Sequence, residues 1–348
     1  MVKQIIGFFG AWALLMISHG ARCQRLVYCD SSQTNVSFRG MSIAKDGTIW
    51  VSGTKGTIGK CAGEGREWSW VKPAGYENRD FRDIEGFNNQ VALAMAVDSP
   101  GIIIRTTDGG ATWKTVYENR RKGIFLDDMA FRNNKEGICV GDPMEDERLF
   151  VVATVDGGQT WQELEEGQKP KVVAGEAMFA ASGSNAMAHP SEKNAFLLVT
   201  GGKASRLWTI FPFQPSKMPK VKTLPLQQGG QMTGANAIFH TGSFFLIPGG
   251  DYNNPTRSDS NFAVIYKKRP TRLVELNGGY RSSIADNGYT LRVACGVSGI
   301  SWQEAPFASY PSPWGIFSKE PFHVVRCVTG SSIFWLAGSG GKIAMLKF

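Results

Sequence analysis

The sequence predicts an all-β fold, a seven-bladed β-propeller of four-stranded antiparallel blades, and three observations support this prediction. A hairpin motif occurs at Asp108 and again 48 residues later at Asp156. Seven short apolar runs recur at a mean interval of about 47.5 residues. Most of the runs follow an aromatic residue by 14 to 16 positions. Repeats of roughly 40 to 50 residues with four short strands each are typical of propeller blades.

The hairpin motif joins an apolar β-branched run to a second strand-like segment. Its two copies have the sequences RTTDGGATW (residues 105–113) and ATVDGGQTW (residues 153–161). Asp-Gly favours a tight turn because glycine accepts positive φ and the short carboxylate can bond its own backbone. The residues expected to fasten the two turns are Asp108, Gly110, Thr112, Trp113, Asp156, Gly158, Thr160 and Trp161.

Each repeat is predicted to begin with an aromatic-led strand and to continue with an apolar strand that ends in glycine. Six of the seven runs end at Gly53, Gly141, Gly201, Gly249, Gly296 and Gly338, and the run 91–95 lacks the glycine. The leading aromatics are Phe38, Phe81, Phe125, Tyr280 and Phe322. We expect one domain, residues 24–348, with blades near 36–75, 76–119, 120–168, 172–228, 230–277, 279–318, and 320–348 plus 25–35.

The ends of the chain are predicted to meet in one blade. The last repeat stops at its third strand, residues 342–346, whereas residues 25–29 form a strand without a repeat of their own. Adding this N-terminal strand to the last blade would cover an exposed sheet edge.

The first 23 residues resemble a signal for export. Lys3 precedes an apolar run of about 14 residues, which is short for a membrane-spanning helix. Small residues at 21 and 23 suit cleavage before Gln24, although an uncleaved anchor remains an alternative. Loss of Lys3 and Arg22 would lower the formal net charge from +8 to +6. We therefore expect a periplasmic or secreted protein with no membrane span after cleavage.

Composition and spacing argue against several other classes of function. A hydrophobic content of 42% with 20% charged residues is typical of a globular protein. The chain has no basic run interleaved with aromatic residues, which is the pattern that would suggest nucleic-acid binding. The five cysteines after the leader have no paired zinc spacing, and we predict no metal site and no cofactor. Three of them, Cys139, Cys295 and Cys327, lie in apolar runs typical of a core.

Several motifs together resemble one family of exported propellers. The hairpins look like Asp-box (bacterial neuraminidase, BNR) repeats. With Phe38-Arg39-Gly40, the segment 80–85 and the segment 279–282, the chain resembles the photosystem II stability/assembly factor family. The resemblance implies a rigid disc that holds a protein partner through one face, with arginines prominent in the contact. Asp-boxes occur in enzymes and scaffolds alike, so the resemblance specifies fold more than function.

Polar residues beside the leading aromatics are the candidates for a binding site, because the first strand of a propeller blade lines the central channel. These residues are Arg39, Arg82, Asp83, Glu85, Asp127, Asp128, Glu176, Arg281, His323 and Arg326, with Asn185 and Asn236 as nearby amides. Charges on inner strands are costly to bury unless they are paired. The cluster therefore predicts either a lattice of ion pairs around a wet channel or a site for an anionic ligand. Asp142-Pro143 and the segment 249–252 follow strand ends and are interpreted as turns.

An enzymatic alternative uses the same residues. Sialidases on this fold grip a carboxylate with three arginines and use a Tyr nucleophile, a Glu base and an Asp acid. The residues in question are Arg39, Arg281, Arg326, Tyr280, Glu176 and Asp83. Tyr280 is adjacent to Arg281, however, and successive side chains of a strand point to opposite faces. The main prediction is a non-enzymatic scaffold that engages an envelope or extracellular protein, or an anionic ligand such as a glycan.

Overall fold

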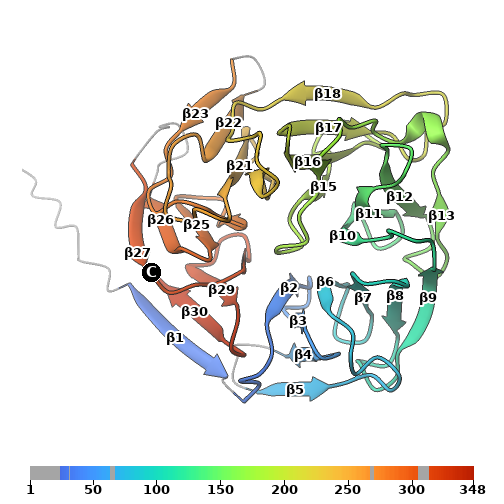
Figure 1. The fold of residues 1–348 in the computed structure, drawn as a ribbon. Coiled ribbons are helices and arrows are strands. Elements are labelled where there is room, and N and C mark those ends of the chain that lie inside the picture. Colours follow the sequence, from blue (N-terminus) through green and yellow to red (C-terminus); the bar gives the residue numbers. More distant parts are fainter. Residues whose placement is uncertain (1–23, 31, 63–66, 267–269, 305–312) are drawn as a thin grey trace, which may run out of the picture.

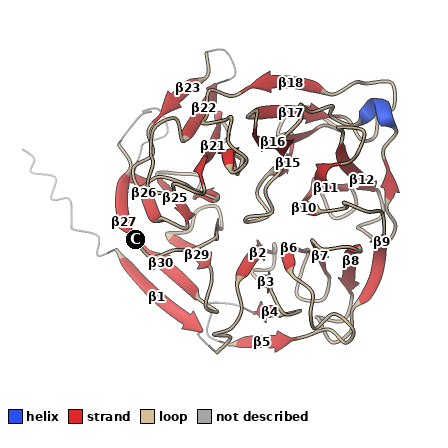
Figure 2. Ribbon diagram, in the orientation of Figure 1, coloured by secondary structure: helices blue, strands red, loops and turns tan. Residues whose placement is uncertain are grey.

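The structure, a computed structural model, describes residues 24–30, 32–62, 67–266, 270–304 and 313–348. Its described residues contain thirty strands and one short 3-10 helix, η1 (Glu166–Gln168) (Figure 2). The prediction of an all-β fold is confirmed. The predicted export signal, residues 1–23, lies outside the described residues. Among the residues that are described, no helix is both long and apolar enough to cross a membrane.

The strands form five four-stranded antiparallel sheets and one ten-stranded sheet. The first contains β2 (Phe38–Ile43), β3 (Ile49–Gly53), β4 (Ile58–Cys61) and β5 (Trp68–Val71). The second contains β6 (Phe81–Gly86), β7 (Ala92–Ala96), β8 (Gly101–Thr106) and β9 (Lys114–Asn119). The third contains β10 (Leu126–Phe131), β11 (Gly137–Pro143), β12 (Leu149–Thr154) and β13 (Gln162–Glu163). The other two are β24 (Ser283–Asp286), β25 (Leu291–Gly296), β26 (Gly299–Glu304) and β27 (Gly315–Ser318); and β1 (Arg25–Asp30), β30 (Ile343–Lys347), β29 (Ile333–Ala337) and β28 (Val324–Cys327).

The ten-stranded sheet consists of two parts that share one backbone pairing. One part contains β14 (Glu176–Ala177), β15 (Ala186–Ala188), β16 (Phe196–Gly202), β17 (Arg206–Ile210) and β18 (Lys220–Thr223). The other contains β19 (Thr233–Ala235), β20 (Phe239–His240), β21 (Phe244–Asp251), β22 (Phe262–Tyr266) and β23 (Arg272–Val274). The parts are joined where Gly201 of β16 pairs with Gly234 of β19.

The sheets are arranged in a ring around a central space (Figure 1). Strand β1 pairs antiparallel with β30, with Arg25 opposite Lys347, so both ends of the described chain lie in one sheet. Because β1 covers β30, the edge of that strand is not left open for another chain.

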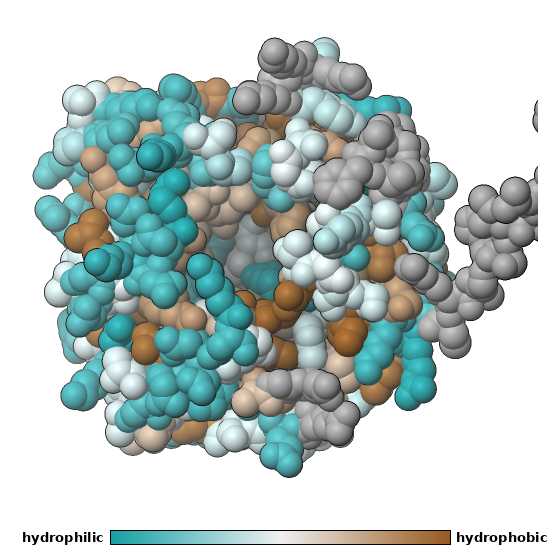
Figure 3. Space-filling model, turned by 180° about the vertical axis from the view of Figure 1, so that it is seen from behind, coloured by the Kyte–Doolittle hydropathy of each residue, from teal (hydrophilic) through white to brown (hydrophobic). Residues whose placement is uncertain are grey.

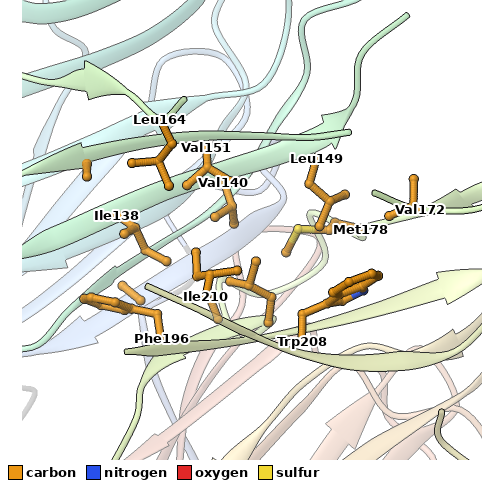
Figure 4. Close-up of a cluster of buried hydrophobic side chains, with 14 residues drawn as sticks. Ile138, Val140, Leu149, Val151, Leu164, Val172, Met178, Phe196, Trp208 and Ile210 are labelled. Carbon is orange, nitrogen blue, oxygen red and sulfur yellow. The ribbon is translucent and has the colours of Figure 1, made fainter. Parts of the chain in front are cut away.

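Buried apolar side chains join each sheet to the next around the ring. The described residues contain seven such clusters, and each combines side chains from two successive repeats. In the cluster of Figure 4, Val140 and Val151 come from β11 and β12, and Phe196 and Ile210 come from β16 and β17. Face-to-face packing of neighbouring sheets therefore holds the ring together, with burial contributing about 25 cal/mol per Å².

The glycine that ends the second strand of a repeat has a steric cause. A Cβ atom on Gly141 would overlap the carbonyl oxygen of Phe125, and one on Gly296 would overlap that of Tyr280. In these two repeats the backbone of the leading aromatic thus passes too close to the next strand for a side chain at the glycine.

The two predicted hairpins are fastened by side-chain hydrogen bonds. The backbone N–H of Thr112 and its Oγ1 donate to the two carboxylate oxygens of Asp108, at 2.9 and 2.5 Å. Thr160 donates to Asp156 in the same way, at 3.0 and 2.6 Å. Trp113 packs edge-on against Trp50 of the preceding sheet. These residues stabilise the outer part of two sheets and do not line the cavity described below.

Candidate functional site

Three inner strands carry a β-bulge at the same place, and each bulge holds a predicted site residue. The strand register shifts between Phe38 and Gly40 in β2, between Phe81 and Asp83 in β6, and between Leu126 and Asp128 in β10. The residues in the bulges are Arg39, Arg82 and Asp127. A bulge bends the strand and re-aims the side chain it carries.

These three residues line one cavity of about 360 Å³ at a mouth of the central channel. Tyr280 and Asn236 also line it, as do residues that the sequence did not single out as site residues: Phe125, Asp142, Ala177, Met178, Phe179, Ala180, Ala181, Gln231, Met232 and Tyr252. Seen from behind, the ring is hollowed at its centre (Figure 3).

The floor of the cavity is a segment that crosses the channel, residues 178–185, which we call the plug. It connects β14 to β15, which both pair with β16, and it reaches the centre of the ring in Figure 1. Ser182 Oγ donates to the carbonyl of Ser282, at 2.6 Å, and the Ile238 amide donates to the Ser184 carbonyl, at 2.8 Å. Arg326 of β28 donates to the carbonyl oxygen of Ser182, at 3.0 Å. The plug therefore contacts several repeats at once, and its first four residues line the cavity.

The two arginines of the cavity differ in how their charges are compensated. Arg82 Nε donates to Asp80 at 2.8 Å, and its guanidinium lies 5.9 Å from the ring centre of Phe125. Arg39 has no hydrogen bond and no ion pair within the described part of the chain. Burial, and next the neighbouring charge of Arg82, lower the pKa of Arg39. Arg39 is thus the cation that remains open to a ligand.

Opposite charges occupy another wall of the cavity. Asp127 is fully buried, and neither carboxylate oxygen is hydrogen-bonded to another described residue. Burial, and next the carboxylate of Asp142, raise the pKa of Asp127 well above its ordinary value. The charge of Arg82, and then the nearby amides of Ala180 and Asp142, offset this only in part. Asp142 Oδ1 accepts the Met178 amide at 3.1 Å, and burial raises its pKa to about 6. Burial therefore disfavours the charged form of both carboxyl groups in this acidic wall.

Below the cavity, Asp83 and Asp128 support the plug and its surroundings. Asp83 accepts the amides of Ile84, at 2.8 Å, and Met129, at 2.7 Å. Asp128 accepts the amide of Ala186, at 2.6 Å, immediately after the plug. Burial, and next the charge of Asp83, raise the pKa of Asp128 well above its ordinary value. Burial thus disfavours the charged form of both Asp83 and Asp128.

Glu85 lies apart from this cavity, in a hollow of about 200 Å³ at the end of β2 and β6. Burial, and next the charge of Asp83, raise the pKa of Glu85 to about 8. A raised folded-state pKa means that the native protein binds more protons than the unfolded chain between pH 4.5 and 8. Across that window, stability must fall as the pH rises.

Replacement of Glu85 by glutamine should remove this contribution to the pH dependence of stability. We expect the free energy of unfolding of Glu85→Gln, measured with urea, to fall less between pH 4.5 and 8 than that of the wild type. The side chain is partly exposed, so solvent screening reduces the effect. Glu67→Gln, at an exposed position, is the control. If the free energy of unfolding of Glu85→Gln depends on pH as steeply as that of the wild type, Glu85 has the same pKa in the folded and unfolded states.

Three other predicted residues are engaged in structural contacts outside the cavity. Arg281 is fully buried and donates to Ser298 Oγ and Ser301 Oγ, both at 2.6 Å. Glu176 forms an ion pair with Arg206, at 3.0 Å. His323 Nε2 lies 2.8 Å from Ser339 Oγ, and burial lowers its pKa to about 3, so the ring is neutral. Tyr280 lines the cavity and its neighbour Arg281 does not, although both lie just before β24.

The sialidase alternative requires six residues that the structure does not bring together. Of these, Arg39 and Tyr280 line the cavity. The Tyr280 hydroxyl donates to Asn236 at 2.8 Å, and burial raises its pKa. Glu176, the suggested base, is held by Arg206 and accepts a hydrogen bond from Thr200, at 2.6 Å. Within the described residues, no base is hydrogen-bonded to a nucleophile in the cavity.

Sequence reasoning missed three polar members of the cavity: Gln231, Asp142 and Tyr252. Asp142 follows the last buried residues of β11, and Tyr252 follows β21; both were interpreted as turns. The positions of Asp142 and Tyr252 in their repeats could have identified them, because the ends of second strands lie at the same mouth of the channel as the beginnings of first strands. Tyr252 packs edge-on against Tyr280, with 5.5 Å between ring centres.

No disulfide bond joins the cysteines among the described residues. Cys139 and Cys295 are fully buried, as expected of core residues, whereas Cys327 is only half-buried. The structure identifies no group of three or more potential metal-ligating side chains among the residues it describes.

Comparison with known proteins identifies the fold. No protein-family model and no curated protein sequence matches the chain. Among solved structures, YCF48 bound to D1 peptide matches with a TM-score of 0.64 and 14% identity, over 93% of this chain and 95% of that one. A catalytically inactive virginiamycin B lyase from Staphylococcus aureus, with quinupristin, matches with a TM-score of 0.63 and 10% identity, over 93% and 99%. The WD40 repeats of RRP9 match with a TM-score of 0.62 and 11% identity, over 92% and 97%. The chain is therefore similar to β-propellers, including YCF48, in its whole architecture.

Proposed function

We propose that the protein is a non-enzymatic binding scaffold that holds a partner in the cavity beside Arg39. The observation that carries the proposal is the state of Arg39, which lies in a bulge, faces the cavity and has no ion-pair partner in the described residues. A half-buried guanidinium without a counter-charge is costly, and a bound anionic group would compensate it. The chemistry of the walls supports binding rather than bond cleavage.

The proposal includes a seven-bladed propeller closed by its N-terminal strand. The two parts of the ten-stranded sheet count as two blades in this view, because they share only the Gly201–Gly234 pairing. Seven apolar clusters between successive repeats, and the pairing of β1 with β30, support this count and the single domain 24–348. A closed ring gives the cavity rigid walls, which reduces the entropy lost on binding.

We propose a protein of the cell envelope or exterior as the partner, or an anionic ligand such as a glycan. Residues 1–23 support export by their sequence pattern. The similar propeller YCF48 was solved with a D1 peptide, which supports protein recognition as the mode of binding. A function as a scaffold agrees with the absence of a nucleophile–base pair in the described part of the cavity.

Site-specific photo-crosslinking tests the proposal. A photo-reactive residue at Met232, 37% exposed on the rim of the cavity, should capture a defined partner from the envelope fraction. The same probe at Tyr289, which is 59% exposed and does not line the cavity, is the control. Arg39→Ala in the Met232 background should reduce capture at least about tenfold, the loss expected for a charge-assisted hydrogen bond.

Two results would contradict the scaffold. One is capture of the same proteins from both positions, unaffected by Arg39→Ala. The other is turnover of fluorogenic sialosides by the purified protein that is abolished by Arg39→Ala, which would restore the enzymatic alternative.

A further inference from the structure

The cavity is polarised, with an open cation at one wall and an acidic pair at another. Arg82 is already compensated by Asp80, with 2.8 Å between Nε and Oδ2. Of the remaining groups, Arg39 is a cation, and Asp142 and Asp127 are carboxyl groups whose pKa values burial raises, that of Asp142 to about 6. A simple anion would be attracted by Arg39 and repelled by Asp142.

The acidic wall is poorly explained by a structural role alone. Asp127 is fully buried, and both carboxylate oxygens lack hydrogen bonds within the described residues. Leaving such a group without a partner lowers stability, whereas an apolar side chain of similar shape would avoid this cost. Asp142 uses Oδ1 for the Met178 amide, and no hydrogen bond from a described residue reaches its Oδ2. A donor from outside the protein would satisfy this wall.

Between the charged walls the cavity is apolar. Phe125, Met178, Phe179 and Met232 line it, and the edge-on pair of Tyr252 and Tyr280 adds aromatic surface. A volume of about 360 Å³ lies at the small end of ligand sites, which accept a compact molecule or one end of a longer chain. Methionine side chains adapt to the shape of an apolar ligand.

From this arrangement we propose that the cavity binds a bipolar ligand, in which an apolar body separates an anionic group held by Arg39 from an ammonium or other hydrogen-bond donor held by Asp142 and Asp127. The inference rests on the proposed function of the cavity as a binding site. It narrows that function, because an anion without a donor would leave the acidic wall unsatisfied.

Calorimetric titration with three related probes tests the inference on the unmodified protein at pH 7.5. Phenylalanine carries both charges, 3-phenylpropionate lacks the ammonium, and phenethylamine lacks the carboxylate. We expect phenylalanine to bind about tenfold more tightly than either analogue, the difference that one charge-assisted hydrogen bond provides. No variant is needed for this comparison, so a failure to fold cannot obscure it.

Variants then assign the two ends. Asp142→Asn should remove the affinity advantage of phenylalanine over 3-phenylpropionate while leaving binding of 3-phenylpropionate intact. Arg39→Ala should weaken the binding of both compounds. Asp98→Asn, exposed and outside the cavity, is the control. Equal affinity for phenylalanine and 3-phenylpropionate would overturn the inference and leave an anion site in place. Absence of binding by all three probes would also overturn it, while the crosslinking experiment would still decide whether the cavity holds a partner.

Discussion

Replacement of Gly183 by alanine is expected to lower the free energy of unfolding by about 3 kcal/mol or more. Gly183 has φ +56 in the plug, and the left-handed conformation costs a residue with a side chain about 1–2 kcal/mol. A Cβ atom would also overlap Asp83 Oδ1. Asp83 cannot move cheaply, because its carboxylate accepts the amides of Ile84 and Met129; losing one of these bonds adds about 1–3 kcal/mol.

Gly340→Ala is the matched control for the backbone cost alone. Gly340 has φ +72, and a Cβ atom built on it meets nothing within 4 Å. Urea unfolding of both variants separates the two costs, since only Gly183→Ala adds the overlap. Equal losses of stability would mean that the plug does not rest on Asp83 as the structure has it.

The repeat and its hairpins could be predicted because their causes are local. Asp108 bonds Thr112 four residues away, and a Cβ atom on Gly141 would overlap the carbonyl oxygen of the leading aromatic Phe125, within the same repeat. Such contacts leave a fixed spacing in the sequence. Arg39 and Arg82 could be proposed for the same reason, because each follows the leading aromatic of its repeat.

The remainder of the site depends on contacts between distant repeats. Arg281 follows Tyr280 as Arg39 follows Phe38, yet its guanidinium turns to Ser298 and Ser301. The plug departs from the repeat, and its glycine and serines are typical of any surface loop. Nothing in its sequence shows that it crosses the channel, because the partners that hold it, such as Ile238, Ser282 and Arg326, belong to other repeats.

Arg326→Met is expected to release the plug and to lower stability by about 3 kcal/mol or more. Arg326 Nη1 donates to Ser184 Oγ at 3.0 Å, and Nη2 donates to the carbonyls of Ser182, at 3.0 Å, and Gly183, at 2.6 Å. Methionine keeps the apolar stem and removes all donors. Each buried acceptor left without a partner costs about 1–3 kcal/mol. The charge of Arg326 also lowers the pKa of Asp83, so its loss makes that carboxylate harder to ionise.

Hydrogen exchange at residues 178–185 distinguishes release of the plug from general destabilisation. Arg281→Met is the matched control, because Arg281 is a buried arginine with several donors to its own repeat and none to the plug. Both variants lose stability, but only Arg326→Met should raise exchange selectively in the plug. Unchanged protection there would contradict the role of Arg326 in holding the plug.

Since Ala180 and Ala181 form the floor of the cavity, Arg326→Met should also weaken ligand binding, although Arg326 does not line the cavity. Under the proposed function, the two arginines have separate tasks: Arg39 faces the ligand, and Arg326 holds the surface on which the ligand rests.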